Sequence, residues 1–300
     1  MSSVAGLGAY SSLLDAVRGL RWPARRPVPG GTHGIHRSRR RGTTAEFSEY
    51  QAYRPGDDPR RLDWKLLARS DRAFVRLTDD HAVFPTLLVV DASASMAFPE
   101  RTLDKWRHAS AVAVGLAAVA HAAGDPVGCV VVGGGAVRRL EPRTRRGVVG
   151  EIARALDETV PSGDGTIGGL LTAAGVARGR VVVISDFLAA SDDDESALVT
   201  AVRAWPECYA VHVVAAEELT PDGGDAVVRD PERTDVARPL VGGSDGRAAY
   251  SATFSAWRDE LARRLQSRGA TYTMSVTSGR GEDVARQAER AVRQVVLATW

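Results

Sequence analysis

The sequence predicts an α/β protein with a doubly wound, mainly parallel sheet, preceded by a smaller N-terminal module. From residue 84 onward, short apolar runs at 86–90, 127–132, 181–184 and 208–215 alternate with longer helical patterns. Continuous apolar runs are typical of strands that are buried on both faces. The alternation of such strands with helices is typical of a parallel sheet that is covered by helices on both sides.

The composition is that of an ordinary globular protein with enough apolar residues for a large core. The chain has 300 residues, of which 44% are hydrophobic and 25% are charged, and its formal net charge is +2. This length is compatible with one or two domains. Lys65 and Lys105 are the only lysines, so nearly all positive charge is carried by arginine.

The N-terminal part, residues 1–82, is expected to form a separate module. The spacing of its leucines predicts a helix over 9–21. A basic Pro/Gly/Arg segment, 22–42, follows, and we expect it to be a solvated linker or an arm that binds phosphate or an acidic partner. Because no aromatic residues are interleaved with its arginines, specific nucleic-acid binding is not expected. The remaining elements expected here are a strand at 46–53, a turn at 54–58, a short helix through 67 and a strand at 73–77.

Residues 83–300 are expected to form the α/β domain. A strand at 136–140 is expected beside the second apolar run, and residues 216–247 are expected to form a long excursion with one short strand pair. The helices expected in this part are 102–123, 147–158, 166–177, 194–204, 250–267 and 281–297, and a further strand is expected at 271–276.

Several features favour a cytoplasmic location without a membrane anchor. No apolar stretch reaches the length of about 18 residues that a membrane-spanning helix needs. The first 20 residues lack the basic and apolar regions of a signal peptide. Cys129 and Cys208 lie in apolar, strand-like runs, and we expect them to be buried and free of disulfide bonds.

Polar loops follow two of the predicted strands, and a third precedes a helix. Asp91-Ala-Ser93-Ala-Ser95 follows the first buried strand, and Ser185-Asp186 follows the strand at 181–184. Gly163-Asp-Gly-Thr166 lies at the start of a predicted helix. In doubly wound sheets, ligands bind beyond the carboxyl ends of the strands. We therefore expect these loops to come together.

The side chains of these loops are hard oxygen ligands. Carboxylates and hydroxyls without nitrogen or sulfur suit Mg²⁺, with Mn²⁺ or Ca²⁺ as alternatives, and argue against zinc. The sequence predicts a metal site whose members are Asp91, Ser93, Ser95, Thr166 and Asp186.

The strings VVDASASM, GDGT and ISD resemble the metal-ion-dependent adhesion site (MIDAS) of von Willebrand factor A domains. This resemblance implies that Ser93, Ser95 and Thr166 ligate the cation directly, while Asp91 and Asp186 act close by or through water. It also implies that a carboxylate of a partner protein completes the coordination, without catalysis.

The upstream sequence resembles the domain-of-unknown-function family 58. The resemblance is carried by Gly34-Ile-His36-Arg-Ser38, Gly42, Glu46-Phe47, Tyr53-Arg-Pro-Gly-Asp-Asp58, Arg61-Leu-Asp63-Trp64 and Ala68-Arg69. Bacterial members are typically encoded beside MoxR-type AAA+ ATPases. The resemblance therefore implies that a MoxR-type ATPase or its client protein is the partner, in chaperone or assembly work. The charged residues of this motif are expected either to form a structural ion-pair network or to bind a partner.

Two enzyme classes compete with the interaction module. Gly163 to Gly168 matches GxGxxG, the phosphate-binding pattern of dinucleotide-binding enzymes, but the sequence just before it is helical where that pattern needs a strand. A metal-dependent hydrolase that uses Asp91 and Asp186 is the other alternative. The dinucleotide pattern leaves Asp91, Ser93 and Ser95 unexplained, and no independent feature supports the hydrolase, so a non-enzymatic binding module is the favoured interpretation.

Overall fold

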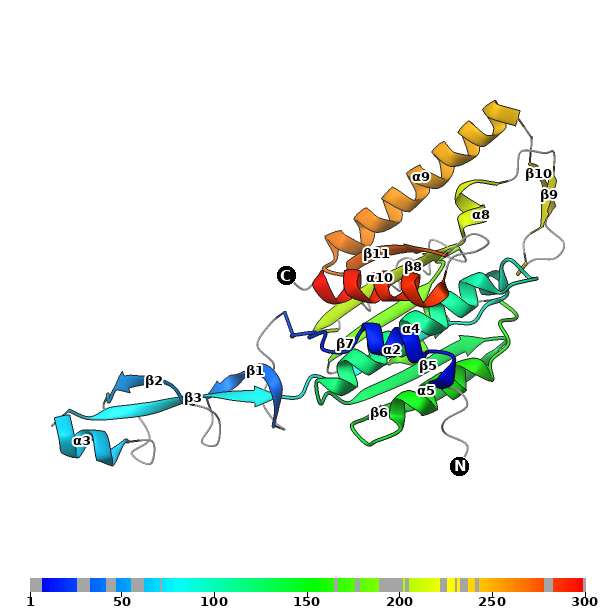
Figure 1. Cartoon of the computed structure of the whole chain (residues 1–300). Coiled ribbons are helices and arrows are strands. Elements are labelled where there is room, and N and C mark those ends of the chain that lie inside the picture. The colour runs from blue at the N-terminus through cyan, green and yellow to red at the C-terminus, as the bar shows by residue number, and fades with distance from the viewer. Residues whose placement is uncertain are drawn as a thin grey trace. The chain divides into compact units, whose positions relative to one another are not determined.

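The computed structural model (Figure 1) divides the chain into two compact units. One consists of Met1–Trp22 and Pro85–Trp300, and the other of Pro23–Phe84. The residues that the structure describes are 7–25, 33–41, 47–54, 62–70, 72–164, 167–175, 179–188, 202, 205–221, 226–229, 231–232, 237–240, 243–277 and 283–298.

The larger unit is built on a six-stranded sheet with the order β11-β8-β7-β4-β5-β6. All neighbouring strands are parallel except β6, which pairs antiparallel with β5. This topology confirms the predicted doubly wound, mainly parallel sheet. The strands are β4 (Thr86–Asp91), β5 (Val127–Gly133), β6 (Ala136–Arg143), β7 (Arg180–Ser185), β8 (Glu207–Val214) and β11 (Thr271–Val276).

The strand order reverses between β4 and β7. From β4 the chain moves outward to β5 and β6, and it then returns to the other side of β4 to form β7, β8 and β11. Such a reversal leaves a crevice at the carboxyl ends of the two central strands, because the connections leave them in opposite directions. Asp91 ends β4 and Asp186 directly follows β7, so both lie at this switch point.

Helices cover both faces of this sheet. Within β4, Leu88 and Val90 pack into the core on one face, and Leu87 and Val89 pack into the core on the other. The first face is covered by α2 (Ser11–Ala16), α4 (Asp104–Ala122), α5 (Val148–Asp157) and α10 (Val284–Leu297). The second is covered by α6 (Ile167–Ala174) and α9 (Gly243–Ser267).

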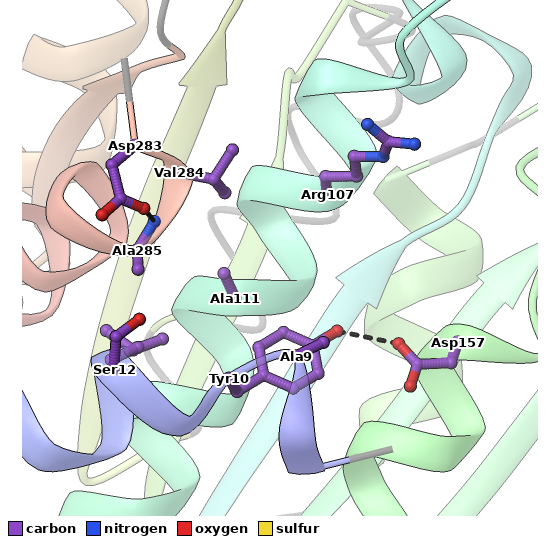
Figure 2. A pocket seen from close by; sticks show the side chains of 10 residues that line it. Ala9, Tyr10, Ser12, Arg107, Ala111, Asp157, Asp283, Val284 and Ala285 are labelled. Carbon is purple, nitrogen blue, oxygen red and sulfur yellow. Dashed lines mark hydrogen bonds between the residues drawn. The ribbon is translucent and has the colours of Figure 1, made fainter. Parts of the chain in front are cut away.

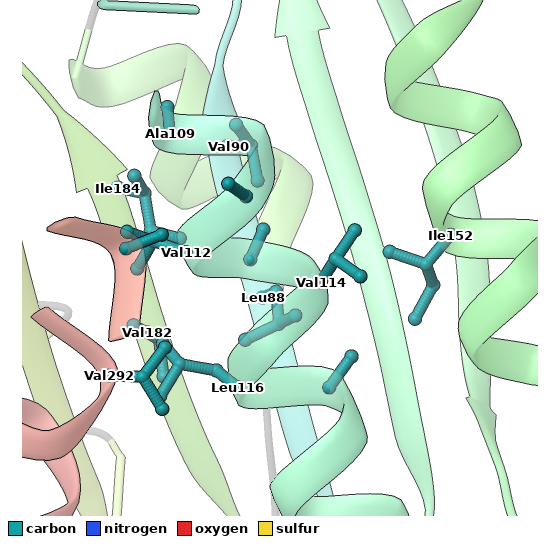
Figure 3. Packing of buried hydrophobic residues seen from close by; sticks show 14 of the residues in the cluster. Leu88, Val90, Ala109, Val112, Val114, Leu116, Ile152, Val182, Ile184 and Val292 are labelled. Atoms are coloured by element: carbon teal, nitrogen blue, oxygen red, sulfur yellow. The ribbon is translucent and has the colours of Figure 1, made fainter. Parts of the chain in front are cut away.

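Helix α4 forms the centre of the first core (Figure 3), where its valines and leucine meet side chains of β4, β7, α5 and α10. The helix is apolar nearly all round, as expected for one that is buried on most sides. At Gly115, an added Cβ would lie 2.7 Å from Val292 Cγ2. The absence of a side chain at this position therefore allows α10 to pack closely against α4.

A buried arginine organises the edge of the sheet where the strands begin. The Arg180 side chain is fully buried, and its guanidinium carbon lies 3.8 Å from the ring centre of Trp22. The same guanidinium donates to the Trp22 carbonyl at 3.0 Å and to Thr86 Oγ1 at 3.3 Å. It also pairs with Glu207 Oε2 at 3.4 Å. Arg180 therefore connects β7 with β8, β4 and the segment that follows α2.

The smaller unit contains a three-stranded antiparallel sheet with the order β1-β3-β2. Its elements are β1 (His33–Arg41), β2 (Phe47–Ala52), α3 (Trp64–Ser70) and β3 (Phe74–Ala82). The expectation that 22–42 is a linker is wrong for residues 33–41, because β3 supplies backbone hydrogen-bond partners along them. Asp63 Oδ1 caps α3 by accepting the N–H groups of Lys65 and Leu66, both at 3.0 Å.

The family-58 motif lies largely in this smaller unit. Trp64, an aromatic residue of this motif, is 65% exposed. Asp57, Asp58, Arg60 and Arg61 lie outside the described residues, so the expected ion-pair network stays a prediction.

The predicted domain boundary between residues 82 and 83 placed the first helix outside the α/β domain. In the structure α2 packs in the core of the larger unit, where Leu13 is buried with Val17 and Trp22. The hydrophobic face of this short helix is buried against α4 and α10. The sequence pattern could not reveal these partners because they lie much later in the chain.

The remaining predictions for the larger unit can be compared with the elements observed. Strand β11 has the predicted bounds, and the expected strand pair is β9 (Ala226–Arg229) with β10 (Ala237–Leu240). Helix α9 starts earlier than predicted, and a short helix, α8 (Ala216–Leu219), follows β8. The helix predicted at 194–204 lies outside the described residues except for Val202.

Two further observations concern the cysteines and the membrane. Cys129 and Cys208 are buried and free, as predicted. Within the described part of the chain, no helix combines the length and the apolar character that crossing a membrane requires.

Replacing Arg180 by methionine is expected to destabilise the larger unit strongly. The substitution leaves Glu207 as a buried carboxylate without this partner, which typically costs about 3–5 kcal/mol. The matched control is Arg138→Met, because Arg138 on β6 of the same sheet forms a half-exposed ion pair with Glu158, which follows α5, and such a pair is worth at most about 1 kcal/mol. Urea denaturation measures the free energy of unfolding of both variants. Equal losses of unfolding free energy in the two variants would contradict the role assigned to Arg180.

Two buried histidines should make the fold sensitive to acid. Burial, reinforced by the charge of Arg290, lowers the pKa of His108 to about 4. Burial also lowers the pKa of His212 to about 4, although the nearby Asp186 acts to raise it. Because an unfolded imidazole has a pKa near 6.5, the stability from these groups is complete above pH 6.5. It is lost as the pH falls toward 4.

We expect His108→Gln to flatten this dependence. Each histidine contributes a loss on the order of 3 kcal/mol between pH 6.5 and 4, and the glutamine has no proton to take up. Denaturation curves at pH 7.5, 6 and 5 measure the slope for the wild type and the variant. If both show the same slope, protonation of His108 does not contribute.

Candidate functional site

The first loop of the candidate site begins at the last residue of β4. Asp91 Oδ1 accepts the backbone N–H of Ser93 at 2.9 Å, which holds the chain in a tight turn as it leaves the strand. A 3₁₀ helix over Ala94–Ala97 follows, and it carries Ser95. Asp91, Ser93 and Ser95 are all buried, so their polar atoms are directed by the loop and are not freely solvated.

The two serine hydroxyls have a spacing that suits a small divalent cation. Ser93 Oγ and Ser95 Oγ form a hydrogen bond with each other at 3.0 Å. Adjacent ligands of an octahedral Mg²⁺ are about 3 Å apart, because each lies about 2.1 Å from the ion. The two hydroxyl groups therefore fit two neighbouring coordination positions of such an ion.

The neighbouring strand β7 brings Ser185 and Asp186 to the same place. The Ser185 hydroxyl donates to Asp91 Oδ2 at 2.6 Å, which links the ends of β4 and β7 directly. Burial, together with the charge of Asp186, raises the pKa of Asp91 to about 6, although hydrogen bonds from Ser185 and Ser93 act to lower it. The structure thus brings four of the five predicted site residues, Asp91, Ser93, Ser95 and Asp186, together at the switch point.

The fifth residue, Thr166, lies outside the described residues, so its place in the site stays a prediction. The described part of its loop nevertheless contacts the first loop. The N–H of Ala94 donates to the Gly163 carbonyl at 2.9 Å, and the N–H of Ser162 donates to the Ala92 carbonyl at the same distance. Helix α6 begins at Ile167, immediately after Thr166.

The structure adds two residues that the sequence analysis did not assign to the site. Lys105 Nζ, from the first turn of α4, lies 2.6 Å from Asp186 Oδ2 and 2.8 Å from Glu218 Oε1. Glu218 belongs to α8, just beyond the end of β8. One sequence signal could have identified Lys105: it is one of two lysines in a chain whose other strong cations are all arginines.

The described residues limit the kinds of ligand that a metal ion could have, and they bear on the competing nucleotide pattern. They contain no cluster of three or more His, Cys, Asp or Glu side chains that could hold a metal ion. Among these residues, an ion at the switch point would need hydroxyl oxygens as well as carboxylates. The GxGxxG pattern at Gly163 follows helix α5 and an irregular segment, whereas a dinucleotide-binding fingerprint follows a strand directly.

A cavity of about 340 Å³ lies elsewhere in the larger unit, between α2, α4, α10 and the end of α5 (Figure 2). Tyr10 Oη donates to Asp157 Oδ1 at 2.8 Å at its wall. Burial, with the hydrogen bond to Asp157, raises the pKa of Tyr10, so the phenol stays protonated. The described lining of this cavity includes none of the predicted site residues.

Solved structures with a similar arrangement share little sequence with this chain. A conserved hypothetical protein, BatB from Bacteroides thetaiotaomicron, is 16% identical with a TM-score of 0.46, covering 71% of this chain and 97% of that one. An aerotolerance-related membrane protein from Bacteroides fragilis is 16% identical with a TM-score of 0.43, covering 71% and 98%. The SpRpn10 VWA domain is 11% identical with a TM-score of 0.39, covering 71% and 95%.

Two mycobacterial proteins are more similar in sequence. The proteins described as uncharacterized protein Rv1480, from Mycobacterium tuberculosis strain H37Rv, and uncharacterized protein Mb1516, from Mycobacterium bovis, are each 30% identical over 266 residues. The match covers 86% of this chain and 83% of each relative. The family described as "Protein of unknown function DUF58" matches residues 49–260. This chain therefore belongs to the DUF58 family.

Proposed function

We propose that the protein is a non-enzymatic interaction module that binds a carboxylate of a partner protein through a divalent cation, most simply Mg²⁺. The observation that carries the proposal is the pair of serine hydroxyls, 3.0 Å apart, beside Asp91 at the switch point of the sheet. Their spacing suits neighbouring ligands of one ion. The von Willebrand factor A-like pattern of the sequence supports the same function.

The roles of the individual residues follow from their positions. Ser93 and Ser95, with Thr166, would hold the ion directly, while Asp91 and Asp186 supply nearby negative charge. The Ser185 hydroxyl keeps Asp91 in place through its hydrogen bond at 2.6 Å. When bound, the ion supplies an electrophilic position that attracts an acidic side chain of the partner.

Exposed apolar side chains lie next to the two central loops. Phe98, which follows the 3₁₀ helix, is 40% exposed, and Leu188, which lies two residues after Asp186, is 49% exposed. Apolar and aromatic residues around a central polar contact are typical of protein interfaces. These side chains support a protein partner over a small molecule.

A hydrolase at this site would need a general base. Asp186 is the residue in the right place, but its Oδ2 is paired with Lys105 at 2.6 Å and its Oδ1 accepts the Leu188 N–H at 3.2 Å. A carboxylate whose two oxygens are both bonded is poorly suited to take a proton from water. This arrangement favours the binding module.

The resemblance to the domain-of-unknown-function family 58 suggests the partner. We propose a MoxR-type AAA+ ATPase, or a client protein of that ATPase, as the source of the carboxylate. The sequence resemblance and the chemistry of the site support this part of the proposal.

Magnesium is expected to stabilise the wild type but not the Asp91→Asn variant. About 10 mM Mg²⁺ should raise the Tm of the wild type by about 3 °C or more, since an ion that binds only the folded state stabilises it. Asparagine preserves the side-chain shape and relieves the repulsion from Asp186, so the Tm without metal should change by less than about 2 °C. Differential scanning fluorimetry with Mg²⁺ or with EDTA measures both effects.

The control for this measurement is Asp15→Asn. Asp15 is an exposed carboxylate on α2 that pairs with Arg18, and it should keep the full response to Mg²⁺. A magnesium response that survives in Asp91→Asn would show that the ion binds elsewhere. A large loss of stability without metal would instead indicate that Asp91 has a structural role.

Binding of the partner should depend on the same ion. Wild-type protein is expected to retain a MoxR-type ATPase from the same organism in a pull-down with Mg²⁺. Both EDTA and Asp91→Asn should reduce the retained amount about tenfold or more, because either change removes the bridge between the two carboxylate-bearing surfaces. If neither EDTA nor Asp91→Asn changes the amount of ATPase retained, a metal-bridged contact is refuted.

A further inference from the structure

Within the described part of the chain, Lys105 is a cation that lies directly against the candidate metal site, where it forms ion pairs with Asp186 and Glu218. Its side chain is fully buried, and its ammonium lies between Asp186 and Glu218. Three separate elements contribute to this triad, namely the start of α4, the loop after β7 and the short helix α8.

The triad is fixed in position by further hydrogen bonds. Glu218 Oε2 accepts the N–H of Ala215 at 2.7 Å, and Asp186 Oδ1 accepts the N–H of Leu188 at 3.2 Å. Burial alone would lower the pKa of Lys105, but the two carboxylates raise it above its ordinary value. The ammonium is therefore a permanent positive charge in a fixed place.

This charge bears on any divalent ion at the neighbouring serines. Asp186 is a predicted member of the metal site, and its negative charge is already balanced by Lys105 at 2.6 Å. A second cation nearby would be repelled by the ammonium, and this repulsion is strong where water is excluded. Lys105 must therefore reduce the affinity of the site for a free metal ion.

We propose that Lys105 is a positioning residue that keeps the intrinsic affinity for the divalent cation low, so that the ion is held firmly only when a partner's carboxylate adds negative charge. The inference rests on the proposed function, since it assigns a regulator to the same site. Lys105 acts on the ion through Asp186 and through its own charge, without contacting the partner. Metal binding and partner binding then favour each other, as linkage requires.

The competing interpretation is that the triad only stabilises the fold. Breaking a buried ion pair destabilises a protein whatever its function, so a loss of stability in a Lys105 variant does not distinguish the two. The affinity for the ion does, because a purely structural pair gives no reason for binding to become tighter when the lysine is removed.

The experiment compares Mn²⁺ or Mg²⁺ binding to three variants by isothermal titration calorimetry. Lys105→Met keeps much of the side-chain volume and removes the ammonium, and we expect the ion to bind about tenfold or more tightly. Glu218→Gln removes a negative charge, so that Asp186 is the remaining carboxylate partner of Lys105 in the triad. We expect this variant to bind the ion several-fold more weakly. Opposite effects cannot come from a general folding defect, which would weaken binding in both variants.

Lys65→Met is the matched control, because Lys65 is the other lysine of the chain and lies exposed on α3. This variant should bind the ion as the wild type does. Having two lysines also allows a direct spectroscopic measurement. In protein labelled with ¹⁵N-lysine, the ammonium signal of Lys105 should shift on addition of Mg²⁺, while that of Lys65 should not.

The outcomes separate this inference from the proposed function. If neither the wild type nor Lys105→Met binds the ion, the metal proposal fails and this inference fails with it. If the wild type binds through Asp91 but Lys105→Met binds equally or more weakly, this inference alone is overturned. If Lys105→Met does not fold, the inference is supported by the ammonium shift together with weaker binding in a Glu218→Gln protein that keeps the wild-type Tm without metal, and the absence of the shift or of the weaker binding overturns it.

Discussion

The burial of the Lys105 ammonium between Asp186 and Glu218 constrains the whole carboxyl edge of the central sheet. A buried charge that loses its partner costs several kcal/mol, so the loop after β7 and the helix α8 must stay where their carboxylates meet the ammonium. Lys105 itself lies in the first turn of α4, whose position is set by apolar packing. The core of the protein thus determines the geometry of its polar site.

The opposite edge of the sheet repeats this arrangement with an arginine. Arg180 begins β7 and pairs with Glu207 at the start of β8, while Asp186 follows β7 at its other end. A fully apolar segment, 181–184, lies between the two charged ends. If β7 slipped by one residue, its side chains would exchange faces and both ion pairs would be lost. Paired charges at both ends therefore fix the register that apolar side chains alone would leave less well determined.

Much of the larger unit could be predicted because its signals are local. A buried parallel strand needs a continuous apolar run, and such runs placed β4, β5, β7 and β8 close to their observed bounds. The same reasoning predicted the site, since polar residues that directly follow a buried strand must emerge at an edge of the sheet. Asp91 and Asp186 come together for this reason and not because of their spacing in sequence.

The features that escaped prediction depend on partners far away in the chain. Residues 33–41 have no apolar alternation, and they form β1 because β3 supplies the hydrogen bonds. Lys105 lies in a first helical turn, where a charged residue would ordinarily be solvated, and its burial depends on carboxylates from the ends of β7 and β8. The sequence does contain one indication that Lys105 is special. Apart from Lys65 and Lys105, all strongly basic residues of the chain are arginines. Lysine carries a compact charge that fits between two carboxylates, whereas the wider guanidinium needs a planar fork of acceptors.

The distribution of charge at the switch point bears on how such a site recognises a protein. With all four groups charged, Asp91, Asp186, Glu218 and Lys105 carry a net negative charge that one divalent ion would neutralise. If a second carboxylate of this chain also neutralised the ion, the ion would attract the acidic side chain of a partner protein only weakly. Lys105 balances the negative charge of Asp186. The electrostatic potential of the ion would therefore stay more positive toward the surface, where Phe98 and Leu188 are exposed. An internal ammonium would therefore weaken the binding of the ion by this chain and, by the same electrostatics, would strengthen the attraction of the ion for a partner's carboxylate.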